Sequence, residues 1–186
     1  PGSQPRAPLS EVPWALAGHL VSPNRGLLVF APVVLFAVAG IAVQLRRRSL
    51  DGLDLALLVV LGAHFAAISW FLVWWAGHSF GPRYATDVLP VLAWFAMSAV
   101  LALGEVRGSA RRAALVVTAL LVAWSFFAQL RAATTWEVWD WNSSPVNVDE
   151  RPARAWDWRD LQILRGLGAA GALDDRAAPT SGTPAS

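Results

Sequence analysis

The sequence predicts an all-α protein: a polytopic transmembrane helical bundle of four spans plus one interfacial helix, with an extracytoplasmic Trp-rich tail. Only 15% of the 186 residues are charged and 55% are hydrophobic, whereas soluble domains carry about 25% charged residues. Several uncharged runs are long enough to cross a hydrocarbon core of about 30 Å. The chain has eleven Trp and one Tyr. Most of the Trp flank apolar runs or lie in the last third of the chain, and amphipathic aromatic rings favour the membrane surface.

The segment ahead of the first span predicts a short helix along the membrane surface. Ser10 is its expected cap and Pro13 lies in its first turn. A helix that runs only to about Val21 is too short to span. We therefore assign residues 1–26 to an extracytoplasmic amino-terminal segment with an interfacial helix.

Residues 27–131 contain the four predicted spans, which are separated by short polar loops. Pro32 and Pro90 fall in first turns, where a missing N–H costs least, and Asp87 is the expected cap of the third span. The predicted spans are Leu27–Leu45, Leu53–Trp75, Val88–Leu103 and Ala113–Leu130.

Arginines in the short loops predict the orientation of the bundle, because cytoplasmic loops carry the excess of positive charge. The 46–52 and 104–112 loops hold three Arg each, and the 76–87 loop holds one. We expect an integral membrane protein whose residues 76–87 and 132–186 are extracytoplasmic.

The last third of the chain divides into two parts. Residues 132–165 form a Trp-rich segment, too aromatic for a disordered tail, and should fold back on the outer membrane surface or on missing parts of the protein. Residues 166–186 are mainly Gly, Ala, Pro, Ser and Thr and should be disordered. The Trp side chains suit interfacial anchoring, and stacking on sugars is the alternative.

Several classes of function find no support in the sequence. The chain has no Cys, no metal-ligand spacing and no Gly-rich phosphate loop, so we expect neither a metal nor a cofactor. A net charge of +2, without an extended basic face, does not suggest a nucleic-acid partner. No paired carboxylates stand out, so we assign no catalytic residue.

The 76–87 loop holds the main candidate for binding an anion. Arg83 follows Gly81 and Pro82 and precedes Tyr84. A guanidinium offers a planar fork of donors for phosphate or carboxylate, and glycine lets the backbone approach a ligand closely. The structural alternatives are an ion pair between Arg83 and Asp87, or capping of a neighbouring helix by Arg83.

Two further residues are candidates at the same predicted face. Arg25, in a Pro-Asn-Arg-Gly turn, could clamp a phosphate together with Arg83, or could anchor in lipid headgroups. His78 could donate to a phosphate or a sugar hydroxyl. His64 lies mid-span, about 15 Å below the outer loop by helical rise, and should bond to a neighbouring helix instead.

Three motifs together resemble the C-terminal portion of bacterial GT-C glycosyltransferases of the protein-mannosyltransferase-like set. The motifs are Ser22-Pro23-Asn24-Arg25-Gly26, Gly77-His78-Ser79-Phe80-Gly81-Pro82-Arg83-Tyr84, and a tail with Pro145-Val146-Asn147-Val148-Asp149 and Trp156-Asp157-Trp158. The resemblance covers most of residues 10–165 and is most specific at Phe80–Tyr84.

The resemblance implies transfer of a sugar from a polyprenyl-phosphate carrier to an acceptor on the outer face of the bacterial plasma membrane. Arg25 and Arg83 would hold the carrier phosphate, Tyr84 and His78 would shape the pocket, and Gly81, Pro82 and Asp87 would support it. The family's catalytic acidic residue lies near the amino end of the full protein. We therefore expect an inactive C-terminal fragment whose partners are membrane lipid, the polyprenyl-phosphate-linked sugar and the missing amino-terminal part of the same protein.

Two other functions remain alternatives. A transporter or flippase for lipid-linked glycans would also need outer arginines, together with polar groups along a path through the bilayer. A non-catalytic membrane scaffold would use the Trp-rich tail to bind a partner.

Overall fold

The computed structural model describes residues 6–167, and every regular element in this part of the chain is a helix. Three helical segments are long and apolar enough to cross a membrane, in agreement with the predicted fold class. They are α4 (Gly52–Ser69), α5 (Leu89–Glu105) with the 3₁₀ segment η3 (Arg83–Val88) before it, and α6 (Gly108–Thr134). The 18 residues of α4 rise about 27 Å, close to the thickness of a hydrocarbon core.

The first predicted span is not one continuous helix. It is divided into α2 (Leu27–Phe30), the 3₁₀ turn η2 (Pro32–Val34) and α3 (Leu35–Arg47). The break falls at Ala31, whose φ of −137° and ψ of 62° lie outside the helical region, because the following proline disfavours helical backbone there. The 13 residues of α3 rise about 20 Å. A fourth crossing of the membrane therefore stays a prediction.

The other helix boundaries differ from prediction in length. Helix α4 ends at Ser69 rather than Trp75, and residues 70–82 form turns. Helix α6 begins at Gly108, so Arg111 and Arg112 belong to its first turns, and only Val106 and Arg107 connect it to α5.

Two predicted caps are wrong. Helix α1 (Val12–Val21), preceded by the 3₁₀ turn η1 (Leu9–Glu11), is capped by Glu11, and α5 is capped by Val88. Neither Ser10 nor Asp87 therefore occupies the cap position. Pro13 and Pro90 do lie in first turns, as expected.

The cap of α4 is a capping box. Asp51 Oδ1 accepts from the backbone N–H of Asp54 at 2.9 Å, and Asp54 Oδ2 accepts from that of Asp51 at 3.1 Å. The second Asp54 oxygen accepts the indole N–H of Trp94 on α5 at 2.8 Å. A carboxylate at the end of this apolar helix thus bonds α4 to α5.

Helix α3 packs along α5, and α1 packs against α4. Glycine makes the α3–α5 approach possible, because a Cβ on Gly40 would overlap the carbonyl oxygen of Phe95. Helix α6 contacts α2 and η2. The main apolar core lies where α2, α3, η3 and α5 meet, around Ala37, Val88 and Phe95.

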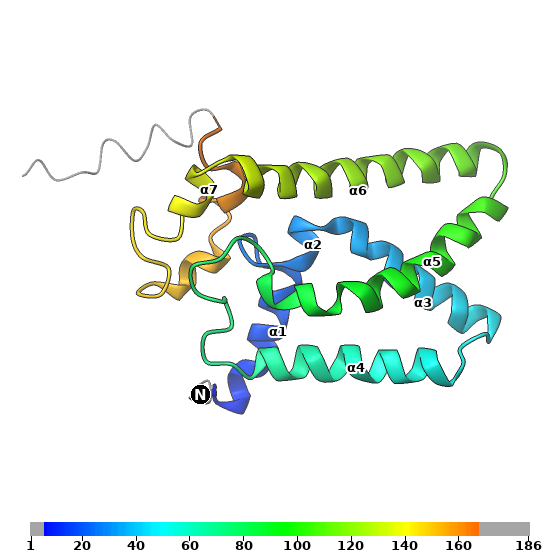
Figure 1. The fold of residues 1–186 in the computed structure, drawn as a ribbon, viewed down its shortest axis with the longest axis horizontal. Helices are drawn as coiled ribbons and strands as arrows, with labels where there is room; N and C mark the ends of the chain where they lie inside the picture. The colour runs from blue at the N-terminus through cyan, green and yellow to red at the C-terminus, as the bar shows by residue number, and fades with distance from the viewer. Residues whose placement is uncertain (1–5, 168–186) are drawn as a thin grey trace, which may run out of the picture.

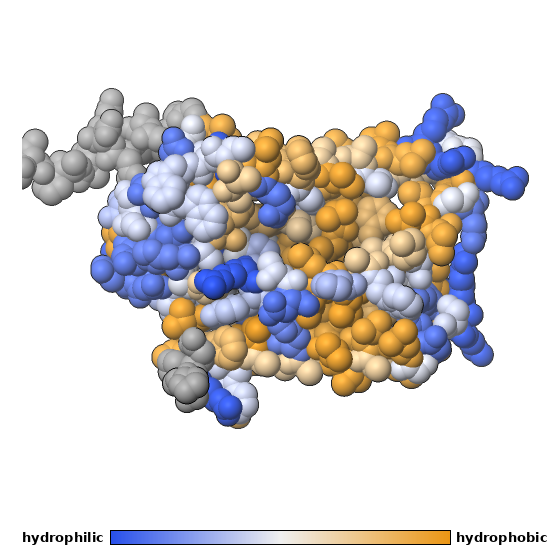
Figure 2. All heavy atoms as spheres, in the orientation of Figure 1, coloured by the Kyte–Doolittle hydropathy of each residue, from blue (hydrophilic) through white to orange (hydrophobic). Residues whose placement is uncertain are grey.

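The bundle has two polar ends with an apolar belt between them (Figures 1 and 2). The α3–α4 and α5–α6 connections lie together at one end, where Arg47 pairs with Glu105 at 3.1 Å. Helix α1, the 70–82 turns and the tail lie at the other end. The loops are therefore grouped at two ends of the bundle, as predicted.

The tail folds over the end of the bundle that carries the 70–82 turns. Its short elements are α7 (Glu137–Asp140), η4 (Pro152–Trp156) and η5 (Gln162–Leu164). Val138, Trp141, Val148, Ala155 and Ile163 are fully buried there. The predicted disordered segment, residues 166–186, lies outside the described residues from 168 onward.

Candidate functional site

The Ser22–Gly26 turn positions Arg25 beneath the tail. The hydroxyl of Ser22 accepts the backbone N–H of Arg25 at 2.9 Å, and the carbonyl of Ser22 accepts that of Gly26 at 2.8 Å. Every residue of the turn is buried. The arginine side chain therefore starts inside the protein rather than at its surface.

The guanidinium of Arg25 is only 1% exposed and is surrounded by acceptors of its own chain. Burial lowers its pKa to about 9, with nearby Asp149 opposing the shift, so the group stays protonated at neutral pH. A phosphate could reach this group only by displacing its present partners. These are the carbonyls of Trp75 (2.7 Å), Asn24 (2.7 Å) and Gly77 (3.2 Å), Gln162 Oε1 (2.7 Å) and Asn142 Oδ1 (2.8 Å).

Left-handed backbone at Ala76 and Gly77, with φ of 62° and 60°, shapes the turn that supplies two of these acceptors. The Trp75 and Gly77 carbonyls both face Arg25. A non-glycine residue adopts this conformation at a cost, which the contacts of the buried guanidinium offset.

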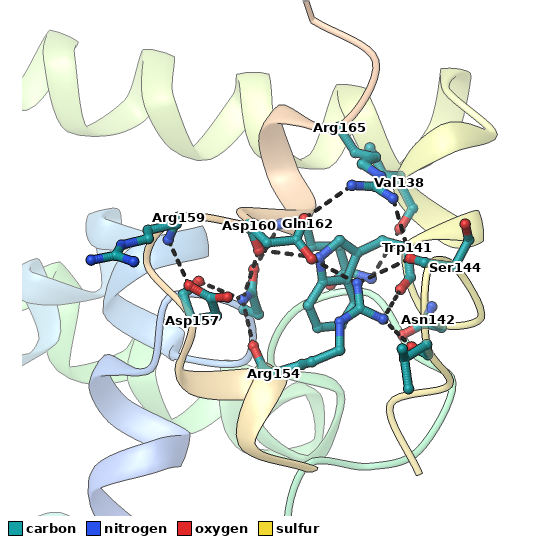
Figure 3. A network of polar contacts seen from close by, with 12 residues as sticks. Val138, Trp141, Asn142, Ser144, Arg154, Asp157, Arg159, Asp160, Gln162 and Arg165 are labelled. Atoms are coloured by element: carbon teal, nitrogen blue, oxygen red, sulfur yellow. Dashed lines mark hydrogen bonds and ion pairs between the residues drawn. The ribbon is translucent and has the colours of Figure 1, made fainter. Parts of the chain in front are cut away.

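A second buried arginine organises the tail itself (Figure 3). Arg154 Nη2 pairs with Asp160 Oδ2 at 2.7 Å, and Asp160 Oδ1 pairs with Arg165 at 3.1 Å. The Arg154 guanidinium also donates to the carbonyls of Trp141, Ser144 and Val146. The Cζ atom of Arg154 lies 4.3 Å from the centroid of the Trp141 ring, and that of Arg25 lies 5.2 Å from it. Both arginines therefore make cation–π contacts with one indole.

Asn24 and Gln162 connect the turn to the tail. Asn24 Nδ2 donates to the carbonyls of Arg154, Asp157 and Asp160, while Asn24 Oδ1 accepts the backbone N–H of Gln162 at 2.7 Å. Gln162 Nε2 donates to the carbonyls of Ser79 and Val138. The sequence analysis missed both side chains, since no local pattern marks a lone amide as a contact between distant segments.

Arg83 has the opposite surroundings. It begins η3, is exposed, and its guanidinium makes no ion pair or side-chain hydrogen bond within residues 6–167. The expected alternative, an ion pair with Asp87, is not formed. Gly81, with φ of +59°, lets the chain pass directly over Phe30, where any Cβ would overlap the ring. This close passage places Arg83 at the edge of the bundle.

Arg83 lines the mouth of an apolar groove beside α5 and α6. Here a cavity of about 420 Å³ is bounded by Arg83, Thr86, Ser125 and Gln129, with apolar side chains between them. A second cavity, of about 450 Å³, adjoins it and is almost entirely apolar. The two share four lining residues, Val33, Val34, Leu89 and Val122. Together they form one groove with its polar groups at one end.

The other predicted site residues do not converge on Arg83. Tyr84 packs edge-on against Phe71 and His19, with ring centroids 5.5 and 6.1 Å away. His78 Nε2 lies 2.9 Å from Asn147 Oδ1 and 3.8 Å from Asp149, so it contacts the tail. Arg25, His78 and Tyr84 therefore line neither cavity of the groove.

His64 lies closer to the outer loop than predicted. Its Nε2 lies 2.7 Å from the carbonyl oxygen of Tyr84, so it does contact the loop that was expected about 15 Å away. The reason is that α4 ends at Ser69, which leaves His64 five residues from the helix end. The histidine thus anchors the loop that carries Arg83.

His19, which the sequence analysis did not single out, is buried beside this loop. Its ring is 4% exposed and packs edge-on against Trp74 at 5.9 Å. Burial lowers its pKa from 6.5 to about 4, and a hydrogen bond to the Ile68 backbone only partly opposes that shift. His19 is therefore neutral at pH 7 and has a packing role.

Comparison with known proteins assigns no family: no family model, no curated protein and no solved structure matches the chain.

Proposed function

We propose that this chain binds an anionic polyprenyl-phosphate lipid as the carrier-binding part of a bacterial membrane glycosyltransferase. In this proposal Arg83 holds the phosphate and the groove beside α5 and α6 receives the prenyl chain. In this proposal the chain binds the carrier, and no residue within it is assigned to the transfer of the sugar. Residues 76–87 and the tail would face away from the cytoplasm.

The observation that carries the proposal is the open guanidinium at the polar end of an apolar groove. An arginine without a partner at the polar end of the groove favours an anionic lipid headgroup. A phosphate can accept two hydrogen bonds from the planar guanidinium. From Leu89 to Leu103 the groove follows α5 for about 21 Å, which suits a long hydrocarbon chain.

No observation favours a flippase. Three polar side chains of the helices are bonded to neighbouring segments: Gln44 Nε2 to Ser98 at 3.0 Å, Asp54 to Trp94 at 2.8 Å, and His64 to the Tyr84 carbonyl at 2.7 Å. These contacts join helices to one another.

The test is binding of polyprenyl phosphate, uncharged polyprenol and phosphatidylglycerol to the full chain in nanodiscs. We expect Arg83→Ala to weaken polyprenyl phosphate binding by about 2–4 kcal/mol and polyprenol binding little, because only the phosphate contact is lost. Arg107→Ala is the matched control, since Arg107 is exposed in the α5–α6 connection at the other end of the bundle. Ala96→Phe, within the apolar part of the groove, should weaken both prenyl lipids.

Unchanged polyprenyl phosphate binding by Arg83→Ala would rule out the proposed phosphate contact. Equal affinity for phosphatidylglycerol would reduce the site to a general anchor for anionic lipids.

A further inference from the structure

The tail contains a cavity that the lipid proposal does not use. It has a volume of about 810 Å³ and lies between the 145–146 turn and the 151–165 segment. Binding cavities for small molecules usually have a volume of about 300–1,000 Å³. This cavity shares no lining residue with the groove at Arg83, so it can be tested separately.

The lining of the cavity carries an excess of positive charge. Four guanidinium groups and two carboxylates face it. Asp160 pairs with both Arg154 and Arg165. By contrast, no ion pair or side-chain hydrogen bond involves the guanidinium of Arg151 or Arg159 among residues 6–167, and Figure 3 shows Arg159 directed away from the Arg154 network. The cavity therefore favours an anionic ligand.

Two Trp side chains make the same lining suitable for a sugar ring. Trp158 is 61% exposed although it belongs to a folded segment. Trp156 also lines the cavity and packs against Trp14, with ring centroids 4.4 Å apart, and against Trp74 at 6.1 Å. The electron-rich face of an indole attracts the C–H groups on the apolar face of a pyranose. A simple anion such as free phosphate offers no such face.

Trp156 also has a hydrogen-bond donor without a partner in the described part of the chain. Its indole Nε1 is buried and has no acceptor among the described residues. A buried donor without a partner is destabilising, so a ligand oxygen that reached it would gain more than it would at a solvated donor.

We propose that this cavity binds an acidic saccharide, in which sugar rings stack on Trp156 and Trp158 and an anionic group lies between Arg151 and Arg159. The site goes beyond carrier binding and does not depend on it, because Arg83 and the groove take no part. The ligand class follows from the combination of two indole rings with unpaired guanidinium groups in the lining of one cavity.

The test is calorimetric titration of the full chain, in zwitterionic nanodiscs, with trigalacturonate, neutral maltotriose and sodium phosphate. We expect trigalacturonate to bind more tightly than maltotriose and phosphate alone to bind weakly. Trp158→Ala should weaken trigalacturonate binding about tenfold, whereas Trp158→Phe should retain most of it. A double variant, Arg151→Gln with Arg159→Gln, should abolish the preference for trigalacturonate over maltotriose.

Trp136→Ala is the matched control, because Trp136 is a 77% exposed tail indole outside the cavity. It should bind trigalacturonate as tightly as the unaltered chain. Absence of trigalacturonate binding, an equal loss in Trp136→Ala, or competition by phosphate alone at the same concentration would overturn the proposal. Loss of adhesion to phosphatidylglycerol vesicles in Trp158→Ala, with trigalacturonate binding unchanged, would indicate a membrane-docking surface instead. Arg83→Ala, which tests carrier binding, should leave trigalacturonate binding intact.

Discussion

Arg25 and Arg83 carry the same side chain and come from similar Gly- and Pro-containing turns, yet they have opposite surroundings. Arg25 is buried and bonded to acceptors from three separate segments, while Arg83 is exposed and open. The first arginine therefore stabilises the fold, and the second remains able to bind a ligand.

Replacement of each arginine should separate these roles. Arg25→Met should lower the free energy of unfolding by about 3–5 kcal/mol, because it removes the hydrogen bonds that Gln162, Asn142 and three carbonyls accept from the guanidinium. Arg83→Met should change it by less than about 0.5 kcal/mol. Chemical unfolding followed by Trp fluorescence measures both. Equal effects from the two substitutions would contradict the assignment of Arg25 as the structural residue.

His19 should make stability depend on pH. The folded protein keeps this histidine neutral down to about pH 4, whereas the unfolded chain protonates it near pH 6.5. Between these pH values the unfolded state binds more protons than the folded state. The contribution of neutral His19 to stability is therefore complete above pH 6.5 and is lost as the pH falls towards 4. We expect His19 to contribute a loss of about 3 kcal/mol across this range. His19→Phe should reduce the difference in unfolding free energy between pH 7 and pH 4.5. An unchanged difference would contradict the role assigned to His19.

At the scale of elements, close approach of backbones decides how the helices pack. Helices α3 and α5 touch at Gly40, whereas α6 lies against α2 and η2. The break at Ala31 turns the chain between α2 and α3, and both α2 and η2 contribute lining residues to the groove. The groove beside α5 and α6 is a consequence of these contacts.

Gly40→Ala should therefore weaken the α3–α5 pair. The added Cβ would overlap the Phe95 carbonyl, and backbone cannot move aside cheaply. We expect a loss of about 1–3 kcal/mol in unfolding free energy. Gly62→Ala in α4 is the matched control, because its Cβ would meet nothing within 4 Å, and alanine favours helix by up to about 1 kcal/mol. Denaturant unfolding of both variants measures this, and a similar change in the two would refute the close-packing explanation.

At the scale of the whole molecule, the two polar ends define which loops share a side. The Arg-rich connections lie at one end and the tail lies with the 70–82 turns at the other, with apolar surface between them (Figures 1 and 2). The arrangement predicts that α6 spans the membrane, and that the broken segment from α2 to α3 makes a fourth crossing.

Single cysteines can test this topology, because the chain contains none of its own. Ser10→Cys, Ser109→Cys and Ser143→Cys place a thiol at three exposed positions. A membrane-impermeant maleimide applied to intact spheroplasts should label the Ser10 and Ser143 variants, and the Ser109 variant only after permeabilisation. Labelling of Ser109 and Ser143 from one side would contradict the crossing by α6. Labelling of Ser10 only after permeabilisation would contradict the fourth crossing.

Run length, charge placement and Trp content in the sequence determined that the chain is helical and apolar enough for a membrane, and which loops belong together. These are local properties, since a helix needs only its own backbone hydrogen bonds and each apolar residue adds its own transfer free energy. The predicted helix ends were less accurate: α4 stops at Ser69, and residues 71–75, although apolar, form turns that pack against α1 and the tail.

Only the tertiary structure decided which arginine is free. Arg25 bonds to residues 117 and 137 positions away, and no pattern in the sequence states that Asn142 and Gln162 will meet it. The buried His19 and the shared Trp141 ring are equally non-local. The physical reason is that the energy of a polar side chain depends on the partners and water that packing leaves around it.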